Sequence, residues 1–335
     1  MSRLRITLFA IAALVFSAAK AENTLSQSDF ARPASIPFPA DNPFTQAKAD
    51  LGKRMFFDPQ FSSTRTVSCA SCHIPNIAWS DTLSHARGVA DQSMSLRTPT
   101  ILNVAWLDTL GWDGKFHSLE SVAFTPITGK LNMNLPEASL IARLSEEPGY
   151  IAAFTEAFGD PTISRDRVEA ALATFERTIV SSRSPFDDWI GGDETAINDA
   201  AKRGFGLFTG KARCAECHSG WSFTDGSFHD IGTATGDDIG RGRLFPTSVK
   251  LRYAFKTPSL RDVARRPPYM HTGAIATLEQ VVELYDQGGI DRPSRSEVIR
   301  PLHLTSEEKS DLLAFLQTLS GKDDHRASIE YQAQP

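Results

Sequence analysis

Two five-residue segments hold the most reactive side chains of the 335-residue chain. Residues 69–73 read CASCH and residues 214–218 read CAECH, and together they use all four cysteines. In a C-x-x-C-H segment the two thiols can bond to the two vinyl groups of a porphyrin, and the following histidine can ligate its iron. The sequence therefore predicts two covalently bound c-type haems. The residues that would attach and ligate them are Cys69, Cys72 and His73 in the first segment and Cys214, Cys217 and His218 in the second.

Three other interpretations of the two motifs are possible: two disulfides, one four-cysteine zinc site, or a chance match. The histidine after each pair distinguishes these segments from a thioredoxin-type C-x-x-C motif. Because two copies of the motif consume every cysteine, haem attachment is the interpretation that we favour.

The chain also contains an internal repeat with a constant offset of 159 residues. RTPTILNVA at 97–105 matches KTPSLRDVA at 256–264, and DGKFHSLESV at 113–122 matches TGAIATLEQV at 272–281. Such self-similarity is typical of a duplicated structural unit. We expect an all-α protein made of two tandem cytochrome c-like domains, each with one haem.

The offset pairs residues of unlike chemistry. Tyr285 lies on the apolar face of an expected helix in TLEQVVELYDQGG, and its partner is Pro126. A tyrosine oxygen can fill the sixth position of a haem iron, whereas proline has no donor atom, so we expect one closed haem and one open haem. Trp112 pairs with His271. Trp112 is either an aromatic electron relay between the haems or a tryptophan that only packs in the core.

The first 21 residues have the features of a secretory signal peptide: Arg3 and Arg5, an apolar run over 6–19, and a final A-x-A. The mature chain is then exported to the periplasm, and no later segment resembles a membrane span. The net charge of −5 argues against a nucleic-acid surface.

Helical periodicity dominates the rest. We expect helices beginning near Glu137, across 168–179, and after a capping box at Thr305 and Glu308. The expected domains are 22–190 and 191–321, followed by a flexible tail over 322–335.

The segments CASCH, RTPTILN, GWDGKFHSLE, CAECH, FKTPSLRDVA and PYMHTGAIATLE, in this order, resemble the bacterial dihaem cytochrome c peroxidase family, and within it the MauG-like (methylamine utilization protein-like) branch. The resemblance implies a peroxide-reactive N-terminal haem, an electron-transfer C-terminal haem, and a tryptophan between them, here Trp112. Classical members carry a methionine ligand fourteen residues after the histidine that matches His271. Tyr285 stands there, as in the MauG-like pattern, and Met270 is the alternative ligand.

Several positions depart from the family pattern. The family's distal glutamine and glutamate are replaced by Val122 and Asn132, and an amide cannot take up the proton that the glutamate shuttles. Glu137 or water would have to substitute. Ala212 replaces a surface tryptophan found in the enzyme that completes a tryptophan-derived quinone in a partner protein. His85 stands too close to His73 to match the histidine that plugs the first haem in classical members.

The family often binds calcium between its haems. Arg97 takes the place of the usual asparagine ligand, so the presence of calcium stays an open question.

These features together predict an exported dihaem c-type oxidoreductase that reduces hydrogen peroxide at the N-terminal haem, with Trp112, Pro126 and Asn132 as catalytic candidates. The electrons would come from a small periplasmic redox protein, a c-type cytochrome or a cupredoxin, or from a residue of a substrate protein. The alternatives are a non-catalytic dihaem electron carrier and a MauG-like oxidase that modifies a partner protein.

Overall fold

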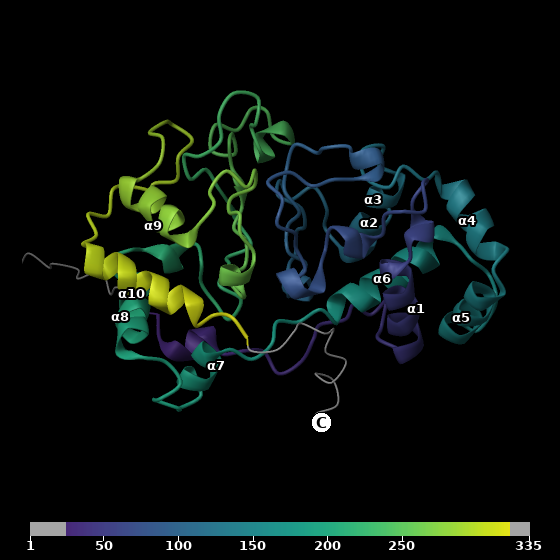
Figure 1. Ribbon diagram of the computed structural model, residues 1–335, viewed down its shortest axis with the longest axis horizontal. Helices are drawn as coiled ribbons and strands as arrows, with labels where there is room; N and C mark the ends of the chain where they lie inside the picture. Colours follow the sequence, from purple (N-terminus) through teal and green to yellow (C-terminus); the bar gives the residue numbers. More distant parts are fainter. Residues whose placement is uncertain (1–24, 322–335) are drawn as a thin grey trace, which may run out of the picture.

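The computed structural model describes residues 25–321 and consists of two lobes that lie side by side (Figure 1). The predicted signal peptide and the predicted tail lie outside the described residues. The first lobe carries α1 to α6 and the second carries α7 to α10. The helices are α1 (Gln46–Phe57), α2 (Leu119–Ala123), α3 (Thr125–Thr128), α4 (Glu137–Ser145), α5 (Pro148–Phe158), α6 (Arg165–Arg177), α7 (Pro185–Ile190), α8 (Asp199–Thr209), α9 (Leu278–Gln287) and α10 (Ser306–Gln317).

Long loops and short 3-10 helices join these elements. In the described residues the only sheet pairs β1 (Phe228–His229) with β2 (Phe255–Lys256), antiparallel, with Phe228 opposite Lys256. The expectation of an all-α fold is therefore confirmed. None of the described helices is both long enough and apolar enough to span a membrane.

Each lobe is built around one close helix crossing. In the first lobe α1 crosses α6 at Gly52, where an added Cβ would lie 2.0 Å from the Ala171 carbonyl oxygen. In the second lobe α8 crosses α10 at Gly204, where an added Cβ would lie 2.0 Å from the Asp311 carbonyl oxygen. No side chain fits at either point, so glycine is required for the backbones to approach. The repeated crossing shows that the sequence repeat reflects a structural duplication.

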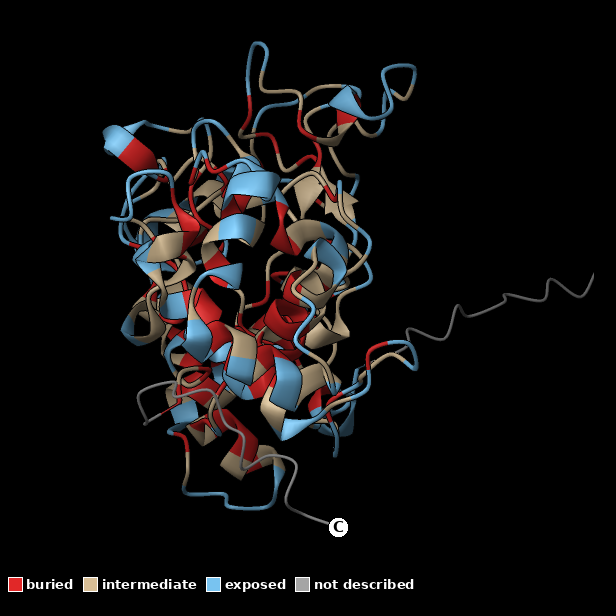
Figure 2. Cartoon of the chain, turned by 90° about the vertical axis from the view of Figure 1, so that its right-hand side faces the viewer, coloured by how far each residue is buried: buried red, intermediate tan, exposed pale blue. Residues whose placement is uncertain are grey.

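The apolar side chains form a separate core in each lobe. In Figure 2 the buried residues gather inside the molecule and the exposed ones lie towards its outside. Phe56 and Phe175 belong to the first core, and Phe205 and Phe315 belong to the second. Two pieces of chain that precede the expected boundary at residue 191 also contribute to the second core. They are Phe30, from the 3-10 helix η1 (Gln27–Phe30), and α7.

The helices expected from periodicity are present as α4, α6 and α10, and side chains cap the N-termini of α6 and α10. Thr305 accepts a hydrogen bond from Glu308 N, and the Glu308 side chain accepts one from Thr305 N, which completes the predicted capping box of α10. α9 begins after the cap Thr277 and ends at Gly288, whose φ of +85° favours glycine. α9 therefore holds Tyr285 on a helix capped at both ends.

The lobes meet through a pair of reciprocal backbone hydrogen bonds. Arg97 N donates to His271 O at 3.0 Å, and Lys256 N donates to Trp112 O at 2.8 Å. The offset of 159 residues exchanges Arg97 with Lys256 and Trp112 with His271. The junction thus has an approximate two-fold symmetry, and it places the predicted relay residue Trp112 at its centre.

Candidate haem sites

The first attachment segment forms a tight turn that orients its histidine. Cys69 begins the 3-10 helix η3 (Cys69–Ser71), and the His73 N–H donates to Cys69 O at 2.9 Å. His73 Nδ1 lies 3.2 Å from Trp79 O. Because a carbonyl only accepts, Nδ1 carries the hydrogen and Nε2 is free to ligate iron. Burial lowers the pKa of His73, which keeps the ring neutral, the form that binds a metal.

The second attachment segment repeats this geometry. Cys214 begins η7 (Cys214–Glu216), and His218 N donates to Cys214 O at 2.8 Å. His218 Nδ1 lies 2.9 Å from Phe223 O, and burial lowers its pKa to about 4. Both segments therefore present a neutral histidine with the same tautomer.

The cysteine geometry argues against the alternatives to haem. All four cysteines are free thiols. Cys69 packs against the first core and Cys214 against the second, so the two pairs lie in different lobes and cannot share one zinc ion.

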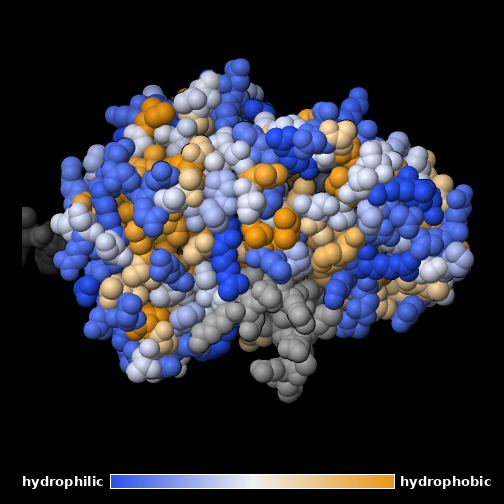
Figure 3. All heavy atoms as spheres, in the orientation of Figure 1, coloured by the Kyte–Doolittle hydropathy of each residue, from blue (hydrophilic) through white to orange (hydrophobic). Residues whose placement is uncertain are grey.

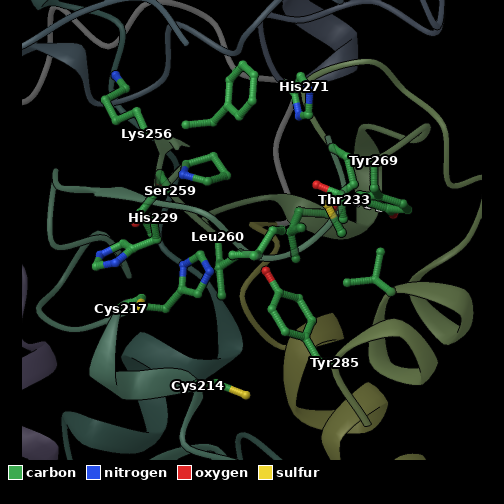
Figure 4. A pocket seen from close by; sticks show the side chains of 18 of the residues that line it. Cys214, Cys217, His229, Thr233, Lys256, Ser259, Leu260, Tyr269, His271 and Tyr285 are labelled. Carbon is green, nitrogen blue, oxygen red and sulfur yellow. Dashed lines mark hydrogen bonds between the residues drawn. The ribbon is translucent and has the colours of Figure 1, made fainter. Parts of the chain in front are cut away.

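A large cavity in the second lobe has the composition that a haem requires. Cys214, Cys217, His218 and Tyr285 all line it, together with many apolar side chains. In Figure 4, Cys217 and His229 approach this cavity from one side, and the hydroxyl group of Tyr285 points into it from α9. On the face drawn in Figure 3, hydrophobic side chains gather over the second lobe near α9. The apolar side chains that line the cavity include Leu102, Phe208, Leu260, Val263, Leu278, Val282, Leu312 and Leu316.

Tyr285 makes no hydrogen bond through its hydroxyl group to any described residue. Removal from water raises the pKa of this phenol, and the neighbouring Cys214 and Cys217 raise it further. A desolvated hydroxyl without a protein partner suits a group that meets a ligand in the cavity. Met270 lines the same cavity, so it stays the alternative donor.

The sequence analysis did not identify a His229–Asp225 pair beside Cys217. His229 Nε2 lies 2.7 Å from Asp225 Oδ2, and this hydrogen bond is the main reason that the pKa of His229 rises to about 10. The donor atoms of Cys217, Asp225 and His229 lie within 4.8 Å of one another. Since haem attachment would consume the Cys217 thiol, we interpret the pair as an ion pair of imidazolium and carboxylate, with no net charge, beside the attachment segment of the second lobe.

His85 of the first lobe corresponds to His229 of the second lobe in a short stretch of similar sequence. WSDTLSH, ending at His85, aligns with FTDGSFH, ending at His229, which is a resemblance that sequence comparison alone could have found. His85 Nδ1 lies 3.3 Å from Ser84 Oγ, and Ser84 packs closely against Gly273 of the second lobe. The His85 loop is thus held at the junction between the lobes.

The predicted distal residues of the first site lie on one short segment. Pro126 lies in α3, and its carbonyl accepts a hydrogen bond from Met133 N at 3.1 Å. Asn132 lies in the turn that follows, where its Nδ2 donates to Met94 Sδ at 3.2 Å and its carbonyl accepts from Val89 N at 2.7 Å. The helix α3 and this turn therefore place Pro126 and Asn132 close together.

Glu137 and Ala212, the other two positions considered in the sequence analysis, lie outside this segment. Glu137 is half exposed on α4 and forms an ion pair with Arg165 at 3.2 Å, so its location does not support a role as the missing proton carrier. Ala212 is buried and lines the cavity of the second lobe.

Trp112 reaches from the first lobe into the second. It lines the second cavity, and its Nε1 donates to Arg97 O at 3.0 Å. Its ring centroid lies 6.3 Å from that of His271, which is stacked on Phe255 at 3.6 Å. His271 Nε2 also lies 2.6 Å from Asp238 Oδ2. Trp112 and its repeat counterpart are therefore adjacent at the junction.

Glu176 is a second acidic residue that the sequence analysis missed. Desolvation raises the pKa of its carboxyl group to about 8. Desolvation also raises the pKa of the Cys69 thiol, and a negative charge on Glu176 adds to that rise. The equivalent helix crossings align Glu176 of α6 with Leu316 of α10, which lines the second cavity. A signal was present in the sequence, because Glu176 lies four residues after Leu172 and three before Ile179 on the apolar stripe of its helix.

Models of known protein families match both lobes of the chain. Residues 46–195 match the family model described as di-haem cytochrome c peroxidase, and residues 201–320 match the model for cytochrome c. The chain is 50% identical to methylamine utilization protein MauG of Methylorubrum extorquens, over 88% of this chain and 84% of that protein. It is 47% identical to methylamine utilization protein MauG of Methylophilus methylotrophus, over 92% of each.

A solved structure gives the same result for the fold. The crystal structure of a MauG-like protein associated with microbial copper homeostasis superposes with a TM-score of 0.82 and 29% identity, over 90% of this chain and 97% of that one. The two family models imply haem c cofactors, and the chain is a dihaem oxidoreductase. The chain belongs to the dihaem cytochrome c peroxidase family, in its MauG-like branch.

Proposed function

We propose that this dihaem oxidoreductase reduces hydrogen peroxide at the haem of the first lobe and exchanges electrons through the haem of the second lobe. The observation that carries the proposal is the asymmetry of one repeated position. Pro126 offers no donor atom, whereas Tyr285 directs a hydroxyl group into the second cavity. An open iron suits a reaction with peroxide, and a closed iron suits electron transfer.

In the first site, the bound haem supplies an iron that exchanges single electrons and reacts with peroxide. His73 would hold this iron through Nε2, whereas Pro126 has no donor atom with which to ligate it. Asn132 can donate an amide hydrogen bond to a peroxide oxygen, and its present acceptor, a thioether sulfur, is a weak one that peroxide can replace. An amide cannot carry a proton, so the two protons needed to convert peroxide and two electrons into two water molecules would come from water, and Glu176 could donate at most one of them.

In the second site, His218 and Tyr285 line the same cavity and would both hold the iron. Burial opposes ionisation of Tyr285, so the phenol loses its proton only where a cation offsets the cost. An anionic oxygen ligand stabilises oxidised iron and lowers the reduction potential of the second haem.

Trp112 would connect the two sites. Its indole is fixed by the hydrogen bond to Arg97 O, and its backbone carbonyl accepts from Lys256 N, so both lobes hold it in place. Replacing it with phenylalanine should slow electron exchange between the haems without removing either of them.

The cellular setting also belongs to the proposal. The signal-like start of the chain supports a location in the periplasm, where the electron donor would be a small redox protein such as a c-type cytochrome or a cupredoxin.

The test is a stopped-flow absorbance titration of the fully ferric protein with hydrogen peroxide, without prior reduction. We expect the Soret band to bleach at stoichiometric peroxide and to recover when a reductant is added. If the ferric protein does not react, the first haem is plugged by a residue such as His85, or the chain carries electrons without reducing peroxide.

A second candidate function is oxidation of a residue on a partner protein. The 50% identity to a protein of methylamine utilization favours it, whereas Ala212 at the position of the surface tryptophan argues against the same partner site. Incubating the ferric enzyme and peroxide with a candidate partner, followed by intact-mass measurement, separates the two functions. Peroxidase activity alone leaves the partner's mass unchanged.

A further inference from the structure

The guanidinium group of Arg97 lies between the two lobes, and only 5% of the residue is exposed. Four oxygen atoms surround it. From the first lobe, Ser80 Oγ lies at 3.2 Å and Asp81 O at 2.8 Å. From the second lobe, Arg266 O lies at 3.1 Å and Pro268 O also accepts a hydrogen bond. We call these four atoms the oxygen nest.

The oxygen nest contains no carboxylate oxygen. Among the described residues no acidic side chain forms an ion pair with Arg97. Burial lowers the pKa of Arg97, and the nearby charge of Asp81 partly offsets this effect. Asp81 directs its own carboxylate elsewhere, because Oδ1 accepts from Leu83 N and Oδ2 from Thr98 Oγ1.

Carbonyl and hydroxyl oxygens converging on one buried point are also what a hard cation such as calcium binds. Calcium does not fit here, because the guanidinium group occupies the oxygens that would be its ligands and its positive charge would repel the ion. The family's interlobe calcium and this chain's Arg97 therefore exclude each other.

The repeat supports a cation-bridging role for this position. Lys256, the counterpart of Arg97, donates through Nζ to Thr109 O at 3.2 Å, and Thr109 is the counterpart of Pro268. Each lobe thus sends one cationic side chain across the junction to the equivalent carbonyl of the other. The fork of an arginine can satisfy several acceptors at once, whereas Lys256 binds one.

We propose that Arg97 is a built-in cation that occupies the oxygen nest and makes the junction between the lobes independent of calcium. Arg97 is a positioning residue, because its carbonyl accepts the Trp112 Nε1 hydrogen bond and its N–H donates to His271 O. Its guanidinium group therefore fixes the backbone that holds the predicted relay tryptophan.

The first test uses the wild-type holoprotein and does not depend on peroxide chemistry. After dialysis against buffer free of chelator, elemental analysis should find no stoichiometric calcium. Chelation with EGTA should change neither the thermal midpoint nor the haem absorption spectrum. One tightly held calcium ion per chain, or a midpoint that falls with EGTA, would overturn the proposal.

The second test converts the nest into a calcium site. Arg97→Asn removes the guanidinium group and leaves the four oxygens, so the thermal midpoint should fall by roughly 5 °C. Calcium should then bind, measured by calorimetry, and should restore most of that loss, whereas magnesium should do so poorly because it demands smaller, stricter geometry. Arg165→Asn, at an exposed arginine of α6, is the matched control and should show no calcium response.

Arg97→Lys provides the comparison if Arg97→Asn does not fold. A lysine keeps the positive charge but lacks the several donors of a guanidinium group. The Arg97→Lys protein should therefore have a thermal midpoint between those of the wild type and Arg97→Asn, and calcium should not change it. A calcium-independent Arg97→Asn protein with wild-type stability would contradict the proposal, and so would an Arg97→Lys protein that needs calcium.

Discussion

The two lobes share one scaffold and differ at a few positions that the repeat relates to one another. Both have the same glycine-mediated helix crossing and the same hydrogen bond from the proximal histidine to a backbone carbonyl. They differ where Pro126 corresponds to Tyr285 and where Glu176 corresponds to Leu316. Duplication therefore accounts for the shared framework, and in the proposed function substitutions at a few repeat-related positions separate the chemistry of the two sites.

The largest expected effect comes from removing one haem at a time. Replacing Cys69 and Cys72 with alanine should leave one haem per chain and abolish the peroxide-induced bleaching of the ferric protein. Replacing Cys214 and Cys217 should also leave one haem, but the remaining first haem should still react. Haem content by the pyridine haemochrome assay and stopped-flow absorbance measure both effects. Equal loss of reactivity in the two variants would contradict the assignment of peroxide to the first lobe.

The helix crossings should be equally sensitive in both lobes. Gly52→Ala and Gly204→Ala each force a methyl group against a backbone carbonyl and should destabilise their lobe by about 2–3 kcal/mol. Differential scanning calorimetry of the two variants measures this. Gly206→Ala is the control, since it lies on α8 with nothing within 4 Å of its added Cβ, and it should stabilise slightly. If one crossing tolerates alanine, the two lobes are less alike than the structure indicates.

Glu176 should make the stability of the protein depend on pH. Its folded pKa of about 8 is above the ordinary value for glutamate, so the folded state favours the protonated form. Stability is then fully present near pH 4 and is lost as the pH rises through 8, by on the order of 2–5 kcal/mol. Glu176→Gln should remove this loss. Denaturant unfolding at pH 5, 7 and 9 tests it, and parallel curves for both proteins would mean that Glu176 is solvated.

The smallest effect concerns the helix caps, which are also related by the repeat. Thr277→Ala and Ser118→Ala each remove a cap whose side chain accepts a backbone hydrogen bond, at a cost of about 1 kcal/mol. Only Thr277 caps the helix that carries Tyr285, so only Thr277→Ala should perturb the absorption spectrum of the second haem. A spectral change in the Ser118→Ala protein instead would argue against this distinction.

The sequence was informative where the chemistry is local. The C-x-x-C-H segments, the repeat and the capping box of α10 each lie within a few residues or at a fixed offset, and the structure contains all of the corresponding elements. Sequence patterns did not reveal that Phe30 packs with Phe223 in the second core, at 5.0 Å between ring centroids. They also did not reveal the four oxygens around Arg97. Such contacts join segments far apart in the chain, and helical periodicity carries no information about them.

Electron paramagnetic resonance of the ferric holoprotein tests the asymmetry of the two sites most directly. The wild type should show one high-spin signal from the open first haem and one low-spin signal from the second. Tyr285→Phe should remove the low-spin signal and leave the high-spin one, and Met270→Leu should change neither. A low-spin signal that persists in Tyr285→Phe and disappears in Met270→Leu would contradict the account, because the tyrosine would then only pack in the cavity.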